Sequence, residues 1–194
     1  HDSVVGTFSD RLMAGGIPFL SLGESLAMLD QPTVDRLRQA LVASAPDRAN
    51  LFNPSFDEIG VGVVRGASGF FVTAAFIESL RRQPSDEVRR TVLKAIDTAR
   101  TGKGQPAIAT LDEADIAADE IVSSLIAGDT PPSPAFFGSV RVQTMVGPEI
   151  EPLLPSIVKD DRDPAGKVGI AVAFAQTSEY PGGAYYVCAV FVAP

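Results

Sequence analysis

Apolar residues recur at the i, i+3, i+4 spacing of a one-sided helix in four stretches of the chain. The spacing predicts helices over residues 2–14, 32–44, 85–101 and about 110–127. Thr110 and Glu113 form a capping-box pattern that opens the last of these. The glycines after residues 14, 101 and 127 and Pro46 are typical helix ends. Residues 17–28, which Pro18 and Gly23 interrupt, are expected to be irregular.

Short apolar runs bounded by turn residues predict five strands. They cover residues 59–64, 70–76, 139–146, 168–174 and 185–192. Gly66–Gly69 is a turn by composition, and the polar segment Arg81–Pro84 is the best candidate for a linker. We therefore expect two domains, 1–80 and 85–194, each of a size that can bury a small core.

The two predicted strand pairs resemble each other. Residues 59–63 match 168–172, and residues 70–76 match 185–191, at an offset of about 110 residues. This similarity predicts a duplicated unit, although buried hairpins also resemble each other in general. Gly60 and Gly62 share one strand face, which lets a helix or a ligand approach the backbone; close helix packing is the more common reason.

Composition narrows the function. The net charge of −8 argues against a nucleic-acid partner and against attraction to an anionic membrane. No apolar run reaches the length that spans a bilayer, so we expect a chain that is not transmembrane. The single cysteine, Cys188, cannot form an internal disulfide and lies in an apolar run, which predicts a buried, inert thiol. The sequence opens at His1 rather than Met, and we expect a processed product.

Three motifs in one order identify a family resemblance. Gly23–Ala27 reads GESLA, Ser44–Pro54 reads SAPDRANLFNP, and Ile59–Gly62 reads IGVG. They resemble the GEN(I/L)A, Ser-x-x-His-Arg-x-Asn-Leu-Leu-x-Pro and IGVG motifs of CAP domains, the cysteine-rich secretory, antigen 5 and pathogenesis-related family. The resemblance covers residues 1–76. Residues 88–127 resemble the opening helix pair of the same family, and the last hairpin matches as above.

The resemblance implies an α+β fold, a CAP-like α-β-α sandwich in two diverged copies, the first lacking its opening helices. A sheet without those helices would expose apolar surface. We therefore expect that a preceding segment of the same precursor was cleaved and can remain bound as a separate chain; the alternative is that the helices at 85–127 cover both sheets.

In many CAP domains two His and two Glu converge in a cleft and can hold a divalent metal. His1 and Glu24 match two of these positions, Asp47 stands in place of the second His, and Asp10 is merely the nearest acid to the fourth. This implies no catalytic residues, no cofactor and no metal site beyond weak cation binding at His1 and Glu24. His1, Glu24 and Asp47 are then candidates for a ligand-binding cleft; alternatively, Glu24 fixes a loop and Asp47 caps a turn or helix.

The sequence lacks the residues that other catalytic schemes require. A Ser-His-Asp triad must use His1, the one histidine, and the sequence has no Gly-x-Ser-x-Gly motif. We thus expect a non-catalytic CAP-like binding or structural module, secreted or in a bacterial cell envelope. Its partner would be a protein or a small hydrophobic ligand, bound at the cleft or at the Pro-rich stretch 128–165. The alternatives are a metal-assisted hydrolase or protease, and a lipid- or sterol-binding protein.

Overall fold

The computed structural model describes residues 6–136, 138–158 and 166–193. The chain divides into two compact units, unit 1 (His1–Arg81) and unit 2 (Arg82–Pro194), and each has its own sheet. The boundary lies inside the polar segment Arg81–Pro84. The expected mixed α+β class is confirmed.

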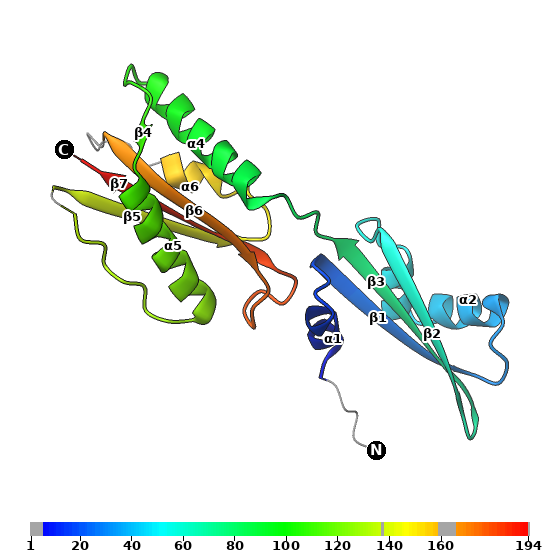
Figure 1. Ribbon diagram of the computed structural model, residues 1–194. Coiled ribbons are helices and arrows are strands. Elements are labelled where there is room, and N and C mark those ends of the chain that lie inside the picture. The colour runs from blue at the N-terminus through cyan, green and yellow to red at the C-terminus, as the bar shows by residue number, and fades with distance from the viewer. Residues whose placement is uncertain (1–5, 137, 159–165, 194) are drawn as a thin grey trace. The chain divides into compact units, whose positions relative to one another are not determined.

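Unit 1 is a three-stranded antiparallel sheet with the strand order β1-β3-β2. A helix precedes β1 and two helices connect β1 to β2 (Figure 1). The elements are α1 (Phe8–Ala14), β1 (Phe19–Leu29), α2 (Val34–Ala43), α3 (Ala45–Leu51), β2 (Glu58–Gly66) and β3 (Gly69–Ser79). The expected hairpin of β2 and β3 is confirmed; α1 begins later than expected, and residues 1–5 lie outside the described part.

The irregular segment expected at 17–28 is wrong, because this stretch forms β1. Pro18 precedes the strand and removes no ladder hydrogen bond. Gly23 lies within the strand, and its lack of a side chain leaves room for Asn50: a Cβ at this position would come within 2.7 Å of the Asn50 Oδ1. Pro46 also does not end the second helix. Ser44 ends α2 and caps α3, and Pro46 sits in the first turn of α3.

Unit 2 is a four-stranded sheet with the order β4-β6-β7-β5, antiparallel except for the short β4·β6 pair. Its elements are α4 (Ser85–Thr101), β4 (Ala109–Thr110), α5 (Asp112–Ala127), β5 (Val140–Gly147), α6 (Leu154–Val158), β6 (Lys167–Ala175) and β7 (Ala184–Val192). The predicted helix 85–101 is confirmed at both ends. The capping box is wrong: Thr110 pairs with Val168 in the sheet, and Leu111 occupies the N-cap without a side-chain cap bond.

Both faces of the unit 2 sheet are covered, with α4 and α6 on one face and α5 on the other (Figure 1). Helix α5 approaches so closely that a Cβ on Gly169 would overlap the backbone of Ala114 and Asp115. All nine residues of β7 are buried between these two layers. Burial on both faces explains why β7 reads as one continuous apolar run.

The two units share a three-strand arrangement. In each, a first strand is followed by a helical connection and then by a hairpin whose second strand is central: β1-β3-β2 in unit 1 and β5-β7-β6 in unit 2. The hairpin registers also agree with the sequence match, since Ile59 pairs with Phe76 as Val168 pairs with Phe191. Duplication of an ancestral unit stays a prediction.

The surroundings of the matched hairpins differ. Four consecutive residues of β6, Val168–Ala171, are buried, whereas every residue of β2 from Glu58 to Arg65 is exposed. Strand β2 is an edge strand of its sheet, and helices α2 and α3 pack against β1. The sheet of unit 1 therefore exposes apolar side chains that the sheet of unit 2 buries.

Candidate functional site

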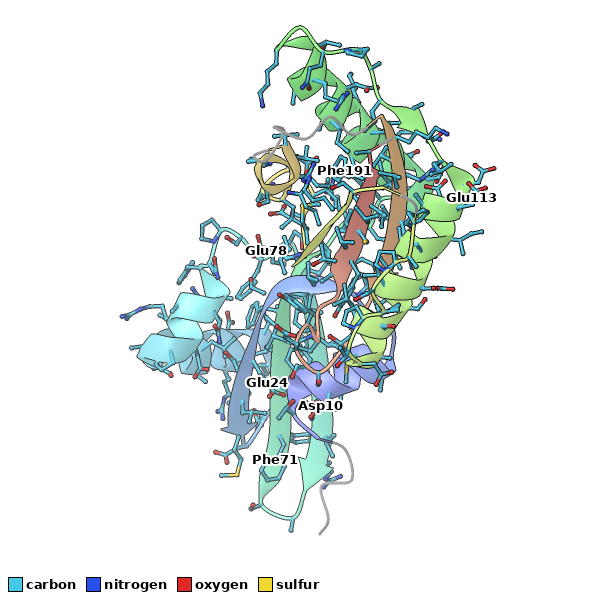
Figure 2. The ribbon with its side chains drawn as sticks, turned by 90° about the vertical axis from the view of Figure 1, so that its left-hand side faces the viewer. Asp10, Glu24, Phe71, Glu78, Glu113 and Phe191 are labelled. Carbon is cyan, nitrogen blue, oxygen red and sulfur yellow. The ribbon has the colours of Figure 1, made fainter. Side chains whose placement is uncertain are left out.

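Glu24, a residue of the candidate cleft, lies on β1 and points toward α1. Its Oε1 accepts a hydrogen bond from the Arg11 Nη2 at 3.1 Å, and both side chains are partly exposed. Figure 2 labels Glu24 on β1 and Asp10 on α1. An exposed pair of this kind contributes little to stability. His1, the second candidate, lies outside the described residues.

Asp47, the third candidate, lies in the first turn of α3, whose N-cap is Ser44. Its backbone N–H donates to the Ser44 Oγ at 3.5 Å, and hydrogen bonds from the Ser44 and then the Ser25 side chains lower the pKa of its carboxyl. Asn50, one turn later, donates from Nδ2 to the Ser25 Oγ at 3.3 Å and to the Glu24 carbonyl at 3.2 Å. Ser25 is almost fully buried. This polar cluster ties α3 to β1.

Glu24 and Asp47 therefore do not share a cleft. Successive side chains of a strand point to opposite faces, and Asp47 meets Ser25 while Glu24 meets Arg11. The expected cleft of Glu24 and Asp47 is not formed between these two side chains. Within residues 6–136, 138–158 and 166–193, no three His, Cys, Asp or Glu side chains come together as potential metal ligands.

Two other residues singled out from the sequence have structural roles. Asp10 closes a capping box at α1: its Oδ2 accepts from the Thr7 N–H at 2.6 Å and from the Thr7 Oγ1 at 2.8 Å, and these bonds lower the pKa of its carboxyl. Cys188 is fully buried in β7, and burial raises the pKa of its thiol to about 12. The expected burial of the Cys188 thiol is confirmed, and the raised pKa supports the expectation that it is unreactive near neutral pH.

One face of the unit 1 sheet, which we name the open face, carries several exposed apolar side chains. Pairing places its members side by side: Met28 opposite Phe71, Leu26 opposite Thr73, and Phe71 opposite Val64. The exposed fractions of Leu26, Met28, Val64 and Phe71 are 69%, 62%, 67% and 52%. Figure 2 shows Phe71 further along the sheet than Glu24, toward the β2–β3 turn. The open face comprises Leu26, Met28, Gly60, Gly62, Val64, Phe71 and Thr73.

The glycines of the open face contact nothing that requires them. A Cβ on Gly62 would meet no atom within 4 Å, and one on Gly60 would reach only the Cβ of Ala75 at 4.0 Å. The close helix packing expected at these glycines is therefore wrong for the described residues. Sequence reasoning identified the small residues but missed Leu26 and Met28, because it did not predict β1. The alternation of Leu26 and Met28 with Ser25 and Ala27 was the available signal.

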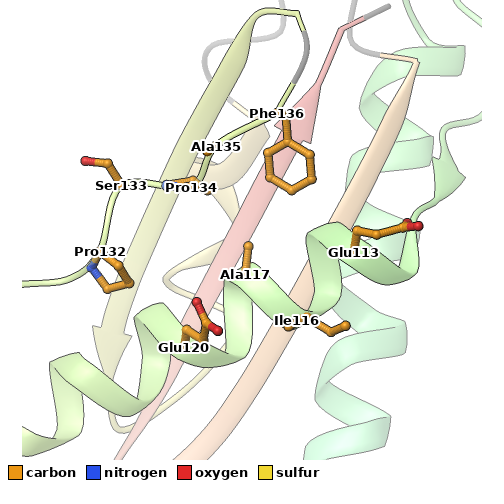
Figure 3. A pocket seen from close by; sticks show the side chains of 9 residues that line it. All are labelled: Glu113, Ile116, Ala117, Glu120, Pro132, Ser133, Pro134, Ala135 and Phe136. Atoms are coloured by element: carbon orange, nitrogen blue, oxygen red, sulfur yellow. The ribbon is translucent and has the colours of Figure 1, made fainter.

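A hollow lies in unit 2, where the Pro-rich segment 132–136 runs over α5 (Figure 3). Its volume is about 270 Å³, and Figure 3 shows Phe136 and Ala117 on its walls and the carboxylates of Glu113 and Glu120 on α5. Phe136 packs against the apolar cluster under α5, so the segment completes the cover of this face. The strand predicted at 139–146, within the Pro-rich stretch 128–165, is confirmed as β5, and the short helix α6 also lies in that stretch.

Comparison of the chain with family models, with curated proteins and with solved structures finds no match. Among the helices of the described residues, none is both long and apolar enough to cross a membrane.

Proposed function

We propose that this protein is a non-catalytic, secreted or envelope-associated binding module that uses the open face of unit 1 to hold a partner. The observation that carries the proposal is the exposure of four large apolar side chains, Leu26, Met28, Val64 and Phe71, on one face of the unit 1 sheet. Contiguous apolar surface of this kind marks interaction sites in soluble domains.

The CAP-like assignment is part of the same proposal. Its support is the placement of the three motifs: GESLA lies on β1, SAPDRAN covers the N-cap and most of α3, and IGVG lies on β2. Asn50 of the second motif donates to the Glu24 carbonyl of the first. These contacts give the motif residues a structural reason to occur together, independent of any catalytic step.

The chemistry at Glu24 and Asp47 supports a non-catalytic role. Glu24 is held by Arg11 and Asp47 by two serines on the other face, so neither is free to act with the other on a substrate. The Asp47 carboxylate, whose pKa is lowered by its hydrogen bonds, is also a poor general base near neutral pH. Binding without turnover is the function that this arrangement supports best.

Metal titration tests the non-catalytic proposal. Isothermal titration of the full chain with Zn²⁺ and with Ca²⁺ is expected to show no saturable binding in the micromolar range. Micromolar binding that Glu24→Ala abolishes and Glu113→Ala leaves intact would contradict the proposal and favour a metal-assisted hydrolase. Glu113→Ala is the matched control, because it removes a carboxylate from the hollow in unit 2.

A further inference from the structure

Strand β2 is an edge strand whose outer side has no partner strand within the described part of the chain. It pairs with β3 along its whole length and with no other strand. The two-residue turn after Gly66 makes Gly66 and Gly69 the hydrogen-bonded pair that closes the hairpin. Hydrogen-bonded and non-hydrogen-bonded pairs alternate along an antiparallel ladder. The backbone N–H and C=O groups of Ile59, Val61 and Val63 therefore point away from β3.

This edge has none of the features with which proteins protect an exposed strand. Such edges normally carry lysine, proline, an inward-pointing charge or a bulge, or lie under a helix or loop. Residues 59–64 read IGVGVV, without a charge or a proline, and pair with β3 without a register shift. The exposed fractions of Ile59, Val61 and Val63 are 60%, 56% and 51%. Unpaired backbone groups flanked by apolar side chains are a template for a further strand.

The apolar residues of β2 match each other when a second copy of the strand runs antiparallel to the first. A two-fold axis at Val61 places Val61 opposite Val61 and Ile59 opposite Val63, in both directions, on one face of the joined sheets. β-Branched residues that stand opposite each other are favourable cross-strand pairs. An axis at Gly62 would instead set Ile59 opposite Arg65. The axis at Val61 therefore keeps apolar residues with apolar residues.

The charges at the two ends of β2 favour the same antiparallel direction. The strand begins at Glu58, directly after Asp57, and its last charged residue is Arg65. Neither Glu58 nor Arg65 belongs to a salt bridge within the described residues. Antiparallel pairing brings the basic end of each copy to the acidic end of the other, whereas parallel pairing would bring like charges together. Complementary charge of this kind sets the direction of an association.

We propose that β2 pairs with β2 of a second copy of this chain, in an antiparallel ladder centred on Val61. The ladder joins two three-stranded sheets into one sheet of six strands. The inference goes beyond the proposed binding function, because it concerns the edge of the unit 1 sheet and leaves the open face accessible. The two-fold axis is perpendicular to the joined sheet, so the open faces of both copies lie on the same side.

Sedimentation equilibrium of the full chain tests the pairing. The chain is expected to dimerise reversibly, and Val61→Lys should weaken the dimer by at least about tenfold, because it sets two like charges opposite each other at the axis. Val64→Lys is the matched control on the same strand. Its side chain lies on the open face, where the ladder places Glu58 of the second copy opposite it, so this variant should still dimerise.

A disulfide tests the register. Directly opposed, hydrogen-bonded residues of an antiparallel ladder have Cα atoms about 5.5 Å apart, which a disulfide can span. Val61→Cys should therefore form a disulfide-linked dimer under mild oxidation, as seen in non-reducing gels. Ala67→Cys, exposed in the turn of the same hairpin, should stay monomeric. The native Cys188 is buried, and burial raises the pKa of its thiol to about 12, so it does not compete.

Three results would overturn the inference. One is a wild-type chain that stays monomeric at about 0.2 mM. Another is a dimer that Val64→Lys dissociates and Val61→Lys leaves intact, which would assign the interface to the open face. The third is Val61→Cys that crosslinks no better than Ala67→Cys, and this result decides the test if far-UV circular dichroism shows that Val61→Lys does not fold. Each leaves the non-catalytic proposal standing, because the metal titration tests that proposal separately.

Discussion

Glycine has opposite meanings at two matched positions of this chain. Gly169 is required, because any Cβ there would overlap the backbone of α5, whereas Gly60 stands in open space. The sequence shows the same pattern of small residues at both sites and cannot distinguish them. The difference depends on whether a helix is present above the strand.

This contrast gives a prediction from urea unfolding. Gly169→Ala is expected to lower the free energy of unfolding of unit 2 by at least about 2 kcal/mol, because the helix must shift to admit the methyl group. Gly60→Ala should be neutral or stabilising by about 0.5 kcal/mol, since alanine restricts the unfolded chain. Equal effects of the two substitutions would refute the assignment of α5 to Gly169.

The lowered pKa of Asp47 predicts that the stability of unit 1 depends on pH in the acidic range. Its folded pKa lies below its unfolded value, so its contribution to stability is present above the unfolded pKa and is lost as pH falls through the folded pKa. Stability should therefore decrease below about pH 4. Ser44→Ala removes the principal cause of the shift and should flatten this decrease, as measured by urea midpoints from about pH 2 to pH 6. An unchanged slope would show that the Ser44 bond does not hold the carboxylate.

At the scale of elements, α4, α5 and β6 meet in one polar clamp. The Asp115 carboxylate accepts from the Ile170 N–H at 2.7 Å and from the Arg89 Nη2 at 2.6 Å, and the Arg89 Nε donates to the Ile170 carbonyl at 2.9 Å. The clamp fixes both helices to one residue of β6. It explains how α5 is held without a side-chain N-cap.

Asp115→Ala tests the clamp. The substitution is expected to lower the free energy of unfolding by about 2 kcal/mol. It removes hydrogen bonds to a charged group and takes away the carboxylate that accepts from the Ile170 N–H. Asp86→Ala is the control: it breaks an exposed i,i+4 pair with Arg90 and should cost about 0.5 kcal/mol or less. Thermal or urea unfolding measures both, and similar losses would contradict the clamp.

The accuracy of prediction from sequence also varies by element. Residues 85–101 were predictable because their apolar stripe is regular and Gly102 follows it. Strand β1 was not, since Pro18 and Gly23 read as breaks although one precedes the strand and the other faces Asn50. That miss also misplaced the candidate site: once β1 is a strand, Glu24 and Asp47 belong to opposite faces. Both errors have the same cause: contacts between residues far apart in the sequence, such as Gly23 with Asn50, determine the structure and leave no signal in the local pattern.

On the scale of the molecule, the units differ in how completely they cover their sheets. Unit 2 buries both faces, whereas unit 1 leaves the open face exposed and contains carboxyls of lowered pKa at Asp10, Asp47 and Asp57. Less buried apolar area means less stabilisation. We therefore expect unit 1 to be the less stable unit, and more so in acid.

The tyrosines allow this order to be measured. The chain has no tryptophan, and its three tyrosines, Tyr180, Tyr185 and Tyr186, all belong to unit 2. Far-UV circular dichroism reports both units. In urea at about pH 4 the dichroism signal should begin to fall before tyrosine fluorescence changes. Coincident transitions would show that the units unfold together.

Solvent accessibility at the open face tests the central claim most directly. A soluble nitroxide added to the labelled full chain should broaden the methyl resonances of Leu26, Met28 and Val64 strongly and leave those of Val187 and Val190 sharp. This is the result expected for a sheet face whose apolar side chains are exposed. Methyl groups of Leu26 and Met28 that are protected as well as those of Val190 would contradict the account, because the face would then already be covered.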